Sequence, residues 1–330
     1  MTLQGVGKSE SSRKLLILVA AFAAVYIFWG STYLAIKYAI ETLPPFLMAG
    51  SRFLFAGSIL FLWARLSKDY EAPRLEHWRT SFVVGTLLLL GGNGAVVLAQ
   101  HYISSSLAAL LVATEPLWIV VLSWLWLKSG RPNWKVALGL VLGFAGVWLL
   151  IGGRPSSGSG TESGQWIGLV AVIVATLSWA TGSIYGLRAP VPKSSLLTAG
   201  MQMIAGSLSL LAVGVIRGEY ASFDPSSVSS SSIFGLIYLI IFGSLVGFTA
   251  YSWLLKNARP SMVATYAYVN PVIAVILGWL IAGESMTGQM LFGAGVVVGA
   301  VVLITSQSRE EPVEVKEIHK SGVPEPRYST

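Results

Sequence analysis

The sequence predicts an all-α integral membrane protein with ten transmembrane helices, and three observations lead to this. Of the 330 residues, 54% are hydrophobic and only 11% are charged, whereas a soluble domain carries about 25% charged residues. The chain also contains ten mostly apolar stretches, each close to the roughly 20 residues that a helix needs to cross the hydrocarbon. Its basic residues gather on alternate connections between these stretches, which is typical of a membrane topology.

The ten predicted spans follow one another with short connections. Turn-forming residues such as Pro44-Pro45 and Pro190-Val191-Pro192 separate them. We expect residues 1–14 to be an N-terminal segment, residues 153–165 to be a polar loop, and residues 306–330 to be a charged, disordered tail. The spans are Leu15–Tyr38, Pro44–Ala64, Phe82–Gln100, Ser104–Leu127, Trp134–Ile151, Trp166–Leu187, Ser194–Ile216, Ile233–Leu255, Ser261–Ile281 and Met286–Thr305.

The distribution of basic residues predicts the orientation in the membrane. If the N-terminus is cytoplasmic, 18 of the 22 Lys and Arg residues lie on the cytoplasmic side, three lie outside, and Arg52 lies within a span. Cytoplasmic loops carry such an excess. We therefore expect a multi-pass inner membrane protein with both termini, including the tail 306–330, in the cytoplasm and the loop 153–165 outside. The bias also accounts for the net charge of +7, so no nucleic-acid partner is predicted.

Several kinds of chemistry have no support in the sequence. The chain has no Cys, and its three His residues are scattered, so neither a disulfide framework nor a metal site is predicted. A phosphate-binding Gly-x-x-x-x-Gly-Lys-Ser/Thr loop, which an ATP-driven pump needs, does not occur in the sequence. No cofactor is therefore expected.

An internal repeat divides the chain at about its middle. A shift of 155 residues places Thr114-Glu115-Pro116 on Val269-Asn270-Pro271, and a shift of 150 places Ala49-Gly50-Ser51-Arg52 on Ala199-Gly200-Met201-Gln202. The copies are residues 15–152 and 166–305, with five spans each. Because five is odd, the second copy is expected to be inverted in the membrane. Inverted repeats are the signature of secondary transporters, whose binding site lies near the midplane between the copies.

These residues together resemble the EamA-type exporters of the drug/metabolite transporter superfamily. The features that carry the resemblance are Phe28-Trp29-Gly30-Ser31 followed by Tyr33, the helix with Arg52, the Glu115-Pro116 and Asn270-Pro271 pair, and Glu284. The resemblance implies a transporter and not an enzyme. It implies alternating-access export of amino acids or related small metabolites, linked to protons or to exchange. It also implies that spans 1–4 and 6–9 line a central cavity.

Two ionisable residues are predicted to lie deep in the membrane, where charged groups are costly and usually functional. Glu115 lies about 11 residues into its span, or roughly 16 Å deep. It either exchanges a proton or binds a substrate ammonium, or it is a structural carboxyl capped by the backbone groups that Pro116 leaves open. Arg52 is expected to face inward, toward Glu115 or a substrate carboxylate, and the alternative is snorkelling to the headgroups. Snorkelling is the preferred interpretation for Lys37, and an interfacial cap is preferred for Glu284.

Neutral residues complete the predicted substrate site. Gln202 and Asn270 occupy the repeat positions of Arg52 and Glu115, and Asn93 adds a polar group. Four aromatic side chains are expected to wall the cavity: Trp29, Tyr33, Trp179 and Tyr266. The small-residue pairs Gly139/Gly143 and Gly295/Gly299 predict close helix contact, either between spans 5 and 10 or along the seam of a homodimer.

Three other functions stay open at this point. An antiporter of phosphorylated or nucleotide-linked sugars would need several cations in the cavity, and the spans contain one. A membrane-embedded enzyme would need clustered catalytic groups at one interface. A non-transporting scaffold or sensor would have a sealed, apolar interior.

Overall fold

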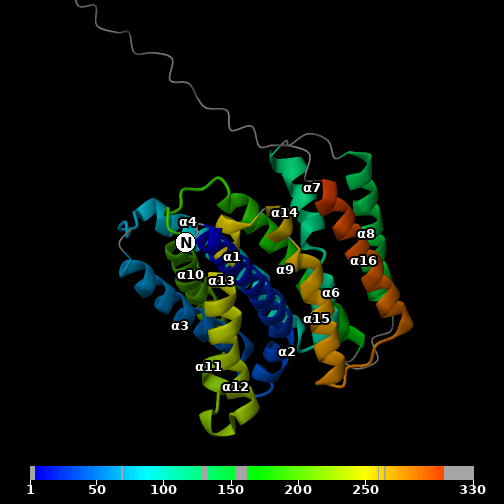
Figure 1. Cartoon of the computed structure of the whole chain (residues 1–330). Helices are drawn as coiled ribbons and strands as arrows, with labels where there is room; N and C mark the ends of the chain where they lie inside the picture. The colour runs from blue at the N-terminus through cyan, green and yellow to red at the C-terminus, as the bar shows by residue number, and fades with distance from the viewer. Residues whose placement is uncertain are drawn as a thin grey trace, which may run out of the picture.

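The computed structural model describes residues 4–67, 70–127, 133–152, 162–258, 260–263 and 265–307. Throughout these ranges the regular structure is helical, without a β-strand, so the predicted all-α fold is confirmed (Figure 1). They contain seven helical segments long and apolar enough to cross a membrane and three shorter apolar helices, which together match the ten predicted spans. Most of the predicted 153–165 loop and nearly all of the 306–330 tail lie outside the described residues.

The first repeat contains spans 1 to 5, and several of its spans are built from more than one helical segment. Span 1 combines α1 (Gln4–Ala24), the π-helical segment η1 (Val25–Trp29) and α2 (Gly30–Ala39), and span 2 is α3 (Pro45–Arg65). Span 3 combines α4 (Leu75–Gly85), the π-helical η2 (Thr86–Gly94) and α5 (Ala95–Ala99). Span 4 is broken into α6 (Ser105–Val112) and α7 (Glu115–Leu127), and span 5 is α8 (Trp134–Gly152).

The second repeat contains spans 6 to 10. Spans 6 and 7 are α9 (Glu162–Gly186) and α10 (Ser195–Ile216), followed by the short helices α11 (Glu219–Ser222) and η3 (Pro225–Ser227). Span 8 combines α12 (Ser230–Tyr238), the π-helical η4 (Leu239–Val246) and α13 (Gly247–Asn257). Span 9 consists of α14 (Pro260–Val263) and α15 (Tyr266–Leu280), and span 10 is α16 (Gly288–Gln307).

Two helix boundaries differ clearly from the predicted spans. The first helix begins at Gln4 and not at Leu15, and the third span begins at Leu75 and not at Phe82. In both cases the added turns carry polar residues. A helix satisfies its backbone hydrogen bonds internally, so it can extend beyond the hydrocarbon, and hydropathy marks only the part inside it.

The two most extensive helix contacts join the two repeats. The larger is between α3 and α10, and the next is between α8 and α16. Figure 1 shows α8 and α16 side by side at one edge of the molecule. Gly139 of α8 packs against Ile304 of α16, as a contact between spans 5 and 10 requires, whereas Gly295 and Gly299 face open space. The homodimer therefore stays a prediction.

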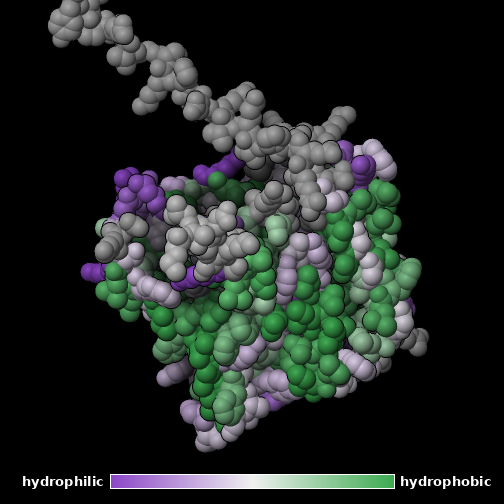
Figure 2. Space-filling view, in the orientation of Figure 1, coloured by the Kyte–Doolittle hydropathy of each residue, from purple (hydrophilic) through white to green (hydrophobic). Residues whose placement is uncertain are grey.

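The outer surface suits a lipid bilayer. Large apolar side chains such as Phe55, Trp148 and Phe292 are exposed along the outside of the helices. Figure 2 shows hydrophobic residues over the middle of the visible face and hydrophilic residues concentrated toward one end. Apolar patches of this extent mark a membrane or interaction surface, and the hydropathy of the helices favours the membrane.

Two buried carboxylates fix helix starts at one face of the molecule. This distal face holds the ends of α2, α10 and α15 and the starts of α3 and α6, on the lower side of Figure 1. Glu219 Oε2 accepts the backbone N–H groups of Phe46 and Leu47 at the start of α3, both at 3.0 Å. Acidic groups stabilise helix N-termini because they accept hydrogen bonds from the free N–H groups and interact favourably with the positive end of the helix dipole.

Glu284 performs the same role for α6, with more donors. It accepts the backbone N–H groups of Ser105 at 2.9 Å and Ser106 at 3.0 Å, and also both serine hydroxyls. Lys37 Nζ lies 3.0 Å from Glu284 Oε1. The prediction that Lys37 snorkels is therefore wrong, since its ammonium has a buried partner within reach. Glu284 is a cap as predicted, but it caps a helix of another span.

These contacts predict how Glu284 stabilises the fold at different pH values. Burial alone would raise the pKa of Glu284, but hydrogen bonds from Ser106, Ser105 and Lys37 outweigh burial and hold the pKa at about 2. An unfolded glutamate has a pKa of about 4.3. The stabilisation should therefore be complete above about pH 4.5 and disappear as the pH falls toward 2.

The measurement is the free energy of unfolding of the wild type and of Glu284→Gln in detergent across this range. The difference between the two proteins should stay constant from pH 8 to 5 and shrink below about pH 4.5. A difference that already shrinks between pH 8 and 6 would contradict the assigned contacts.

Candidate functional site

A cavity lies between the two repeats in the described part of the chain. About 130 Å³ of it is open to the centres of water-sized molecules, which is ample for several waters or a small ligand. The lining side chains come from spans 1–4, 6, 8 and 9 and are mostly apolar or aromatic. They are Trp29, Thr32, Tyr33, Ile36, Arg52, Phe53, Leu89, Gly92, Asn93, Val96, Val112, Glu115, Ala175, Thr176, Trp179, Gly243, Phe248, Tyr266 and Asn270.

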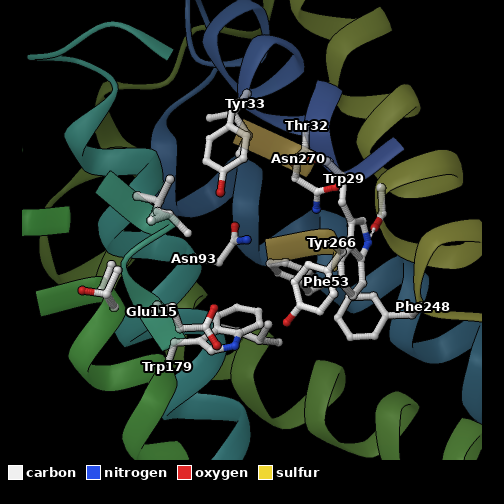
Figure 3. Close-up of a pocket in the computed structure, with 18 of the residues that line it drawn as sticks. Trp29, Thr32, Tyr33, Phe53, Asn93, Glu115, Trp179, Phe248, Tyr266 and Asn270 are labelled. Carbon is white, nitrogen blue, oxygen red and sulfur yellow. Dashed lines mark hydrogen bonds between the residues drawn. The ribbon is translucent and has the colours of Figure 1, made fainter. Parts of the chain in front are cut away.

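The structure brings eight of the nine predicted site residues to this cavity. They are Trp29, Tyr33, Arg52, Asn93, Glu115, Trp179, Tyr266 and Asn270. Figure 3 shows the hydroxyl of Tyr33, the amide of Asn93 and the carboxylate of Glu115 around the same open space. Residues more than 200 positions apart in the sequence thus meet at one site.

Gln202 does not line the cavity. It lies on α10, where its backbone carbonyl packs so closely on Gly85 of α4 that a Cβ there would be 2.3 Å away. Because α10 packs along α3 and α4, this helix lies one layer behind the cavity wall. The resemblance implied that span 7 contributes to the cavity, and no residue of α10 is among its lining.

Glu115 is positioned by a break in span 4. The helix stops at Val112 and restarts at Glu115, and Thr114 Oγ1 donates to the carbonyl of Leu111 at 2.6 Å across the break. Pro116 follows in the first turn of α7, a position that tolerates a missing N–H. Among the described residues, no hydrogen bond or ion pair reaches the Glu115 carboxylate. The alternative of a structural carboxyl capped by the backbone therefore has no contact to support it.

Arg52 faces the cavity and does not snorkel. Its side chain is only 3% exposed, and its Nε donates to Ser244 Oγ of η4 at 2.9 Å. The guanidinium carbon lies 4.6 Å from the ring centre of Phe53, within the range of a cation–π contact. Its Nη1 has no hydrogen-bond partner among the residues that the structure describes. Arg52 and Glu115 line the same cavity, but they form no ion pair within 4.0 Å.

Other cavity residues also carry polar atoms without a partner. The side-chain oxygens of Asn93 and Asn270 are buried and accept no hydrogen bond from the described part of the chain. A buried polar group without a partner costs about 1–3 kcal/mol, so groups of this kind gathered in one cavity point to a polar ligand. The cavity thus presents one cation, one anion and two amides, each with unused hydrogen-bonding capacity.

Three π-helical segments border the cavity, and such segments occur often at functional sites. They are η1, η2 and η4, which contribute Trp29, Asn93 and Gly243 respectively. Trp29 Nε1 donates to the carbonyl of Gly243 at 3.1 Å. The indole also lies so close to the start of α13 that a Cβ on Gly247 would be 2.3 Å from its Nε1. The irregular helices thus let large side chains lie directly against the backbone.

The sequence interpretation did not identify several residues that build the site. Ser244 orients Arg52, the ring of Phe248 lies edge-on to Trp29 with the ring centres 5.5 Å apart, and Thr32 and Gly243 are part of the lining. Gly243 and Gly247 bracket the position where η4 contacts Trp29. Glycines inside an apolar helical stretch were the one available signal, and this signal is weak in a chain with 35 Gly residues.

This fold and cavity define a class of protein, a multi-span membrane transporter with a site between two repeats. The sequence pattern of the EamA-like transporter family matches residues 15–152 and 166–306. The chain therefore belongs to the EamA-like transporter family, as the resemblance predicted, and the two matched segments confirm the two copies.

Individual relatives agree with this assignment. The chain is 38% identical over 295 residues to an uncharacterized inner membrane transporter, YedA of Escherichia coli (strain K12), covering 89% of this chain and 92% of the relative. It is 28% identical over 293 residues to an uncharacterized transporter, YvbV of Bacillus subtilis (strain 168), covering 88% and 92%. A solved structure titled "Crystal structure of protein" shares the fold, with a TM-score of 0.59 at 22% identity over 90% of this chain and 98% of the other. These relatives support a multi-pass inner membrane protein.

The contact between Arg52 and Ser244 can be tested by substitution. Ser244→Ala removes the acceptor of a buried charged donor, so we expect the free energy of unfolding to fall by about 1–3 kcal/mol. Thermal unfolding in detergent measures this change.

Ser207→Ala is the matched control. Ser207 is equally buried, but its hydroxyl donates only to the carbonyl of Ile204 in its own helix, so its loss should change stability much less. Equal effects of the two substitutions would contradict the role of Ser244.

Proposed function

We propose that this chain is a secondary-active transporter that exports amino acids or related small zwitterionic metabolites from the cytoplasm by alternating access. The observation that carries the proposal is that Arg52 and Glu115 line one small cavity without pairing with each other. A charged group inside a membrane protein needs a partner or water. A zwitterion supplies both partners in a single ligand.

Each charge has a defined task in this proposal. Arg52 can hold a substrate carboxylate, since the planar guanidinium accommodates two parallel hydrogen bonds. Ser244 already occupies its Nε, which leaves Nη1 free of any protein partner. Glu115 binds the substrate ammonium, and the aromatic wall of Trp29, Trp179 and Tyr266 covers the apolar part of the substrate.

Size and charge of the cavity favour a small metabolite over the sugar antiporter. The volume of about 130 Å³ that is open to the centres of water-sized molecules favours a small metabolite over a nucleotide-linked sugar. Phosphate groups would also need several cations, whereas Arg52 is the one Lys or Arg among the lining residues that the structure describes.

The repeat supports alternating access. Five spans per copy would place the second copy upside down relative to the first. Glu115 and Asn270 occupy equivalent repeat positions, and both line the cavity, so the two copies meet at the site as the inverted-repeat mechanism requires. The charge bias of the loops favours cytoplasmic termini.

The proposed coupling uses Glu115. A carboxylate without a protein partner in the membrane interior favours any cation that neutralises it, so a proton and a substrate ammonium compete for it. Release of the substrate on one side would then be followed by protonation, and the neutral carboxyl would allow the empty cavity to return.

Glu115→Gln tests this role. In proteoliposomes loaded with a radiolabelled mixture of L-amino acids, the variant should transport at least tenfold less, and its residual transport should not depend on a proton gradient. Gln keeps the shape of the side chain but takes up no proton and forms no charged hydrogen bond. Normal transport with unchanged pH dependence would show that the proton role is wrong.

Arg52→Gln and Arg52→Lys test the anion site. We expect both variants to reduce amino acid transport, with Arg52→Lys retaining more, because Lys keeps the charge but loses the two-bond geometry. The control is Gln202→Ala, the equivalent position of the second repeat, which lies outside the cavity and should transport normally. If Gln202→Ala is as defective as Arg52→Gln, the assignment of the anion site to Arg52 is wrong.

A further inference from the structure

A single carboxylate joins three helices that also line the cavity. Glu284 follows α15, and its two oxygens accept hydrogen bonds from the backbone and hydroxyl groups of Ser105 and Ser106 at the start of α6 and from Lys37 on α2. The same helices or their continuations carry Tyr33, Glu115 and Asn270 into the cavity. A change at Glu284 can therefore reach the site through rigid helices.

The local backbone is built to place this carboxylate. The chain reverses direction after α15 at Gly283, whose φ of 62° lies in the left-handed region that favours glycine. The N–H of Glu284 then donates to the carbonyl of Gly278 at 3.0 Å. At Gly278 the helices approach so closely that a Cβ would be 2.3 Å from Ser106 Oγ and 2.6 Å from Glu284 Oε2.

Buried side chains lie along the same helices between this contact and the cavity. All residues of α6 from Ser105 to Leu111 are buried, and four of them pack with Ile103, Val275 and Val297 in one apolar cluster. On α2, the cavity-lining residue Ile36 is 2% exposed and directly precedes Lys37. The contact of Glu284 with Lys37, Ser105 and Ser106 thus adjoins tightly packed apolar side chains.

We infer that Glu284, together with Lys37, Ser105 and Ser106, is the latch of the gate at the distal face. It holds α2, α6 and α15 together while the cavity is closed there, and it must release for the cavity to open. The positive-inside bias places this face outside the cell, so the latch would control release of an exported substrate. The inference rests on the proposed function only in taking the cavity to open alternately to the two faces.

The second carboxylate of the same face provides a contrast. Glu219 also accepts two backbone N–H groups at a helix start, but it joins α11 to α3. The helix that precedes α11 is α10, which already shares the most extensive interface with α3. Loss of Glu219 should therefore leave these helices together, whereas α2, α6 and α15 share smaller interfaces and are joined at this face by the five donor groups that Glu284 accepts.

Thiol labelling can test the latch without a known substrate. The chain has no Cys, so Val96→Cys, on the cavity wall near the distal end of α5, provides a single reporter. Intact cells are treated with a membrane-impermeant maleimide, which reaches the outer face, and inside-out vesicles are treated in parallel. The reporter alone should react slowly from outside.

Adding Glu284→Gln should raise the labelling rate from outside about tenfold. Gln lacks the negative charge, and its side-chain NH2 group cannot accept a hydrogen bond from the donors that contact Glu284. A tenfold change corresponds to about 1.4 kcal/mol of closed-state stabilisation. Lys37→Met, which removes one donor only, should give a smaller rise. Glu219→Gln should leave the rate unchanged.

Several results would overturn the latch. One is an unchanged labelling rate in both Glu284→Gln and Lys37→Met, even if Glu284→Gln melts earlier. Another is an equal rise in Glu219→Gln, which would indicate general loosening. A rise confined to inside-out vesicles would also contradict an outer gate. If Glu284→Gln fails to accumulate in the membrane, Lys37→Met alone decides between these outcomes.

The labelling experiment does not depend on the proposed substrate. A failure of amino acid transport would overturn the proposed substrate, but the labelling result would still test the latch.

Discussion

The cost of an unneutralised charge inside the membrane is the constraint on which this structure depends. Spans of this chain are almost free of ionisable groups, and the two that reach the central cavity, Arg52 and Glu115, do not neutralise each other. Arg52 has one neutral partner, Ser244, and Glu115 has no hydrogen-bonding or ionic partner among the described residues. Two charges at the centre of the protein are therefore not neutralised by each other, and the proposed zwitterionic substrate would neutralise both.

Irregular helices make this arrangement possible. The break before Glu115 and the π-helical segments η1, η2 and η4 are departures from ideal geometry that all fall at the depth of the cavity. By contrast, the carboxylates of Glu219 and Glu284 reinforce regular helix starts at the distal face. The fold thus has few hydrogen bonds to the polar side chains of the cavity and many at the helix starts of the distal face. This arrangement suits the proposed transporter, which would open by separating helix ends.

Much of this could be predicted from the sequence, because depth in a membrane is readable from hydropathy. The ten spans, Arg52 and Glu115 follow from where charge is scarce, and Asn270 follows from the internal repeat. The same repeat argument placed Gln202 at the site, but α10 packs behind α3 and so removes it from the cavity. Repeats share a backbone path, and a small shift in helix packing decides which side chains face inward.

Contacts between distant segments could not be predicted. The role of Ser244 depends on η4 meeting α3, and that of Lys37 depends on α2 meeting the end of α15. Neither contact between helices can be predicted from the periodicity of the local sequence. Lys37 was therefore expected to extend to the headgroups, as it could in an isolated helix. Glu284 was expected at the end of its own span, and its contact with Ser105 and Ser106 comes only from tertiary structure.

The most direct test of the central claim is counterflow in proteoliposomes with matched sets of compounds. Each set contains an L-amino acid, its amide, its decarboxylated amine and its deaminated acid, so the members differ in charge and little else. The account predicts that at least one amino acid is transported and that the three relatives lacking one charge are transported at least tenfold more slowly. Equal transport of the amine or the acid would contradict a site that binds both ends of a zwitterion through Arg52 and Glu115.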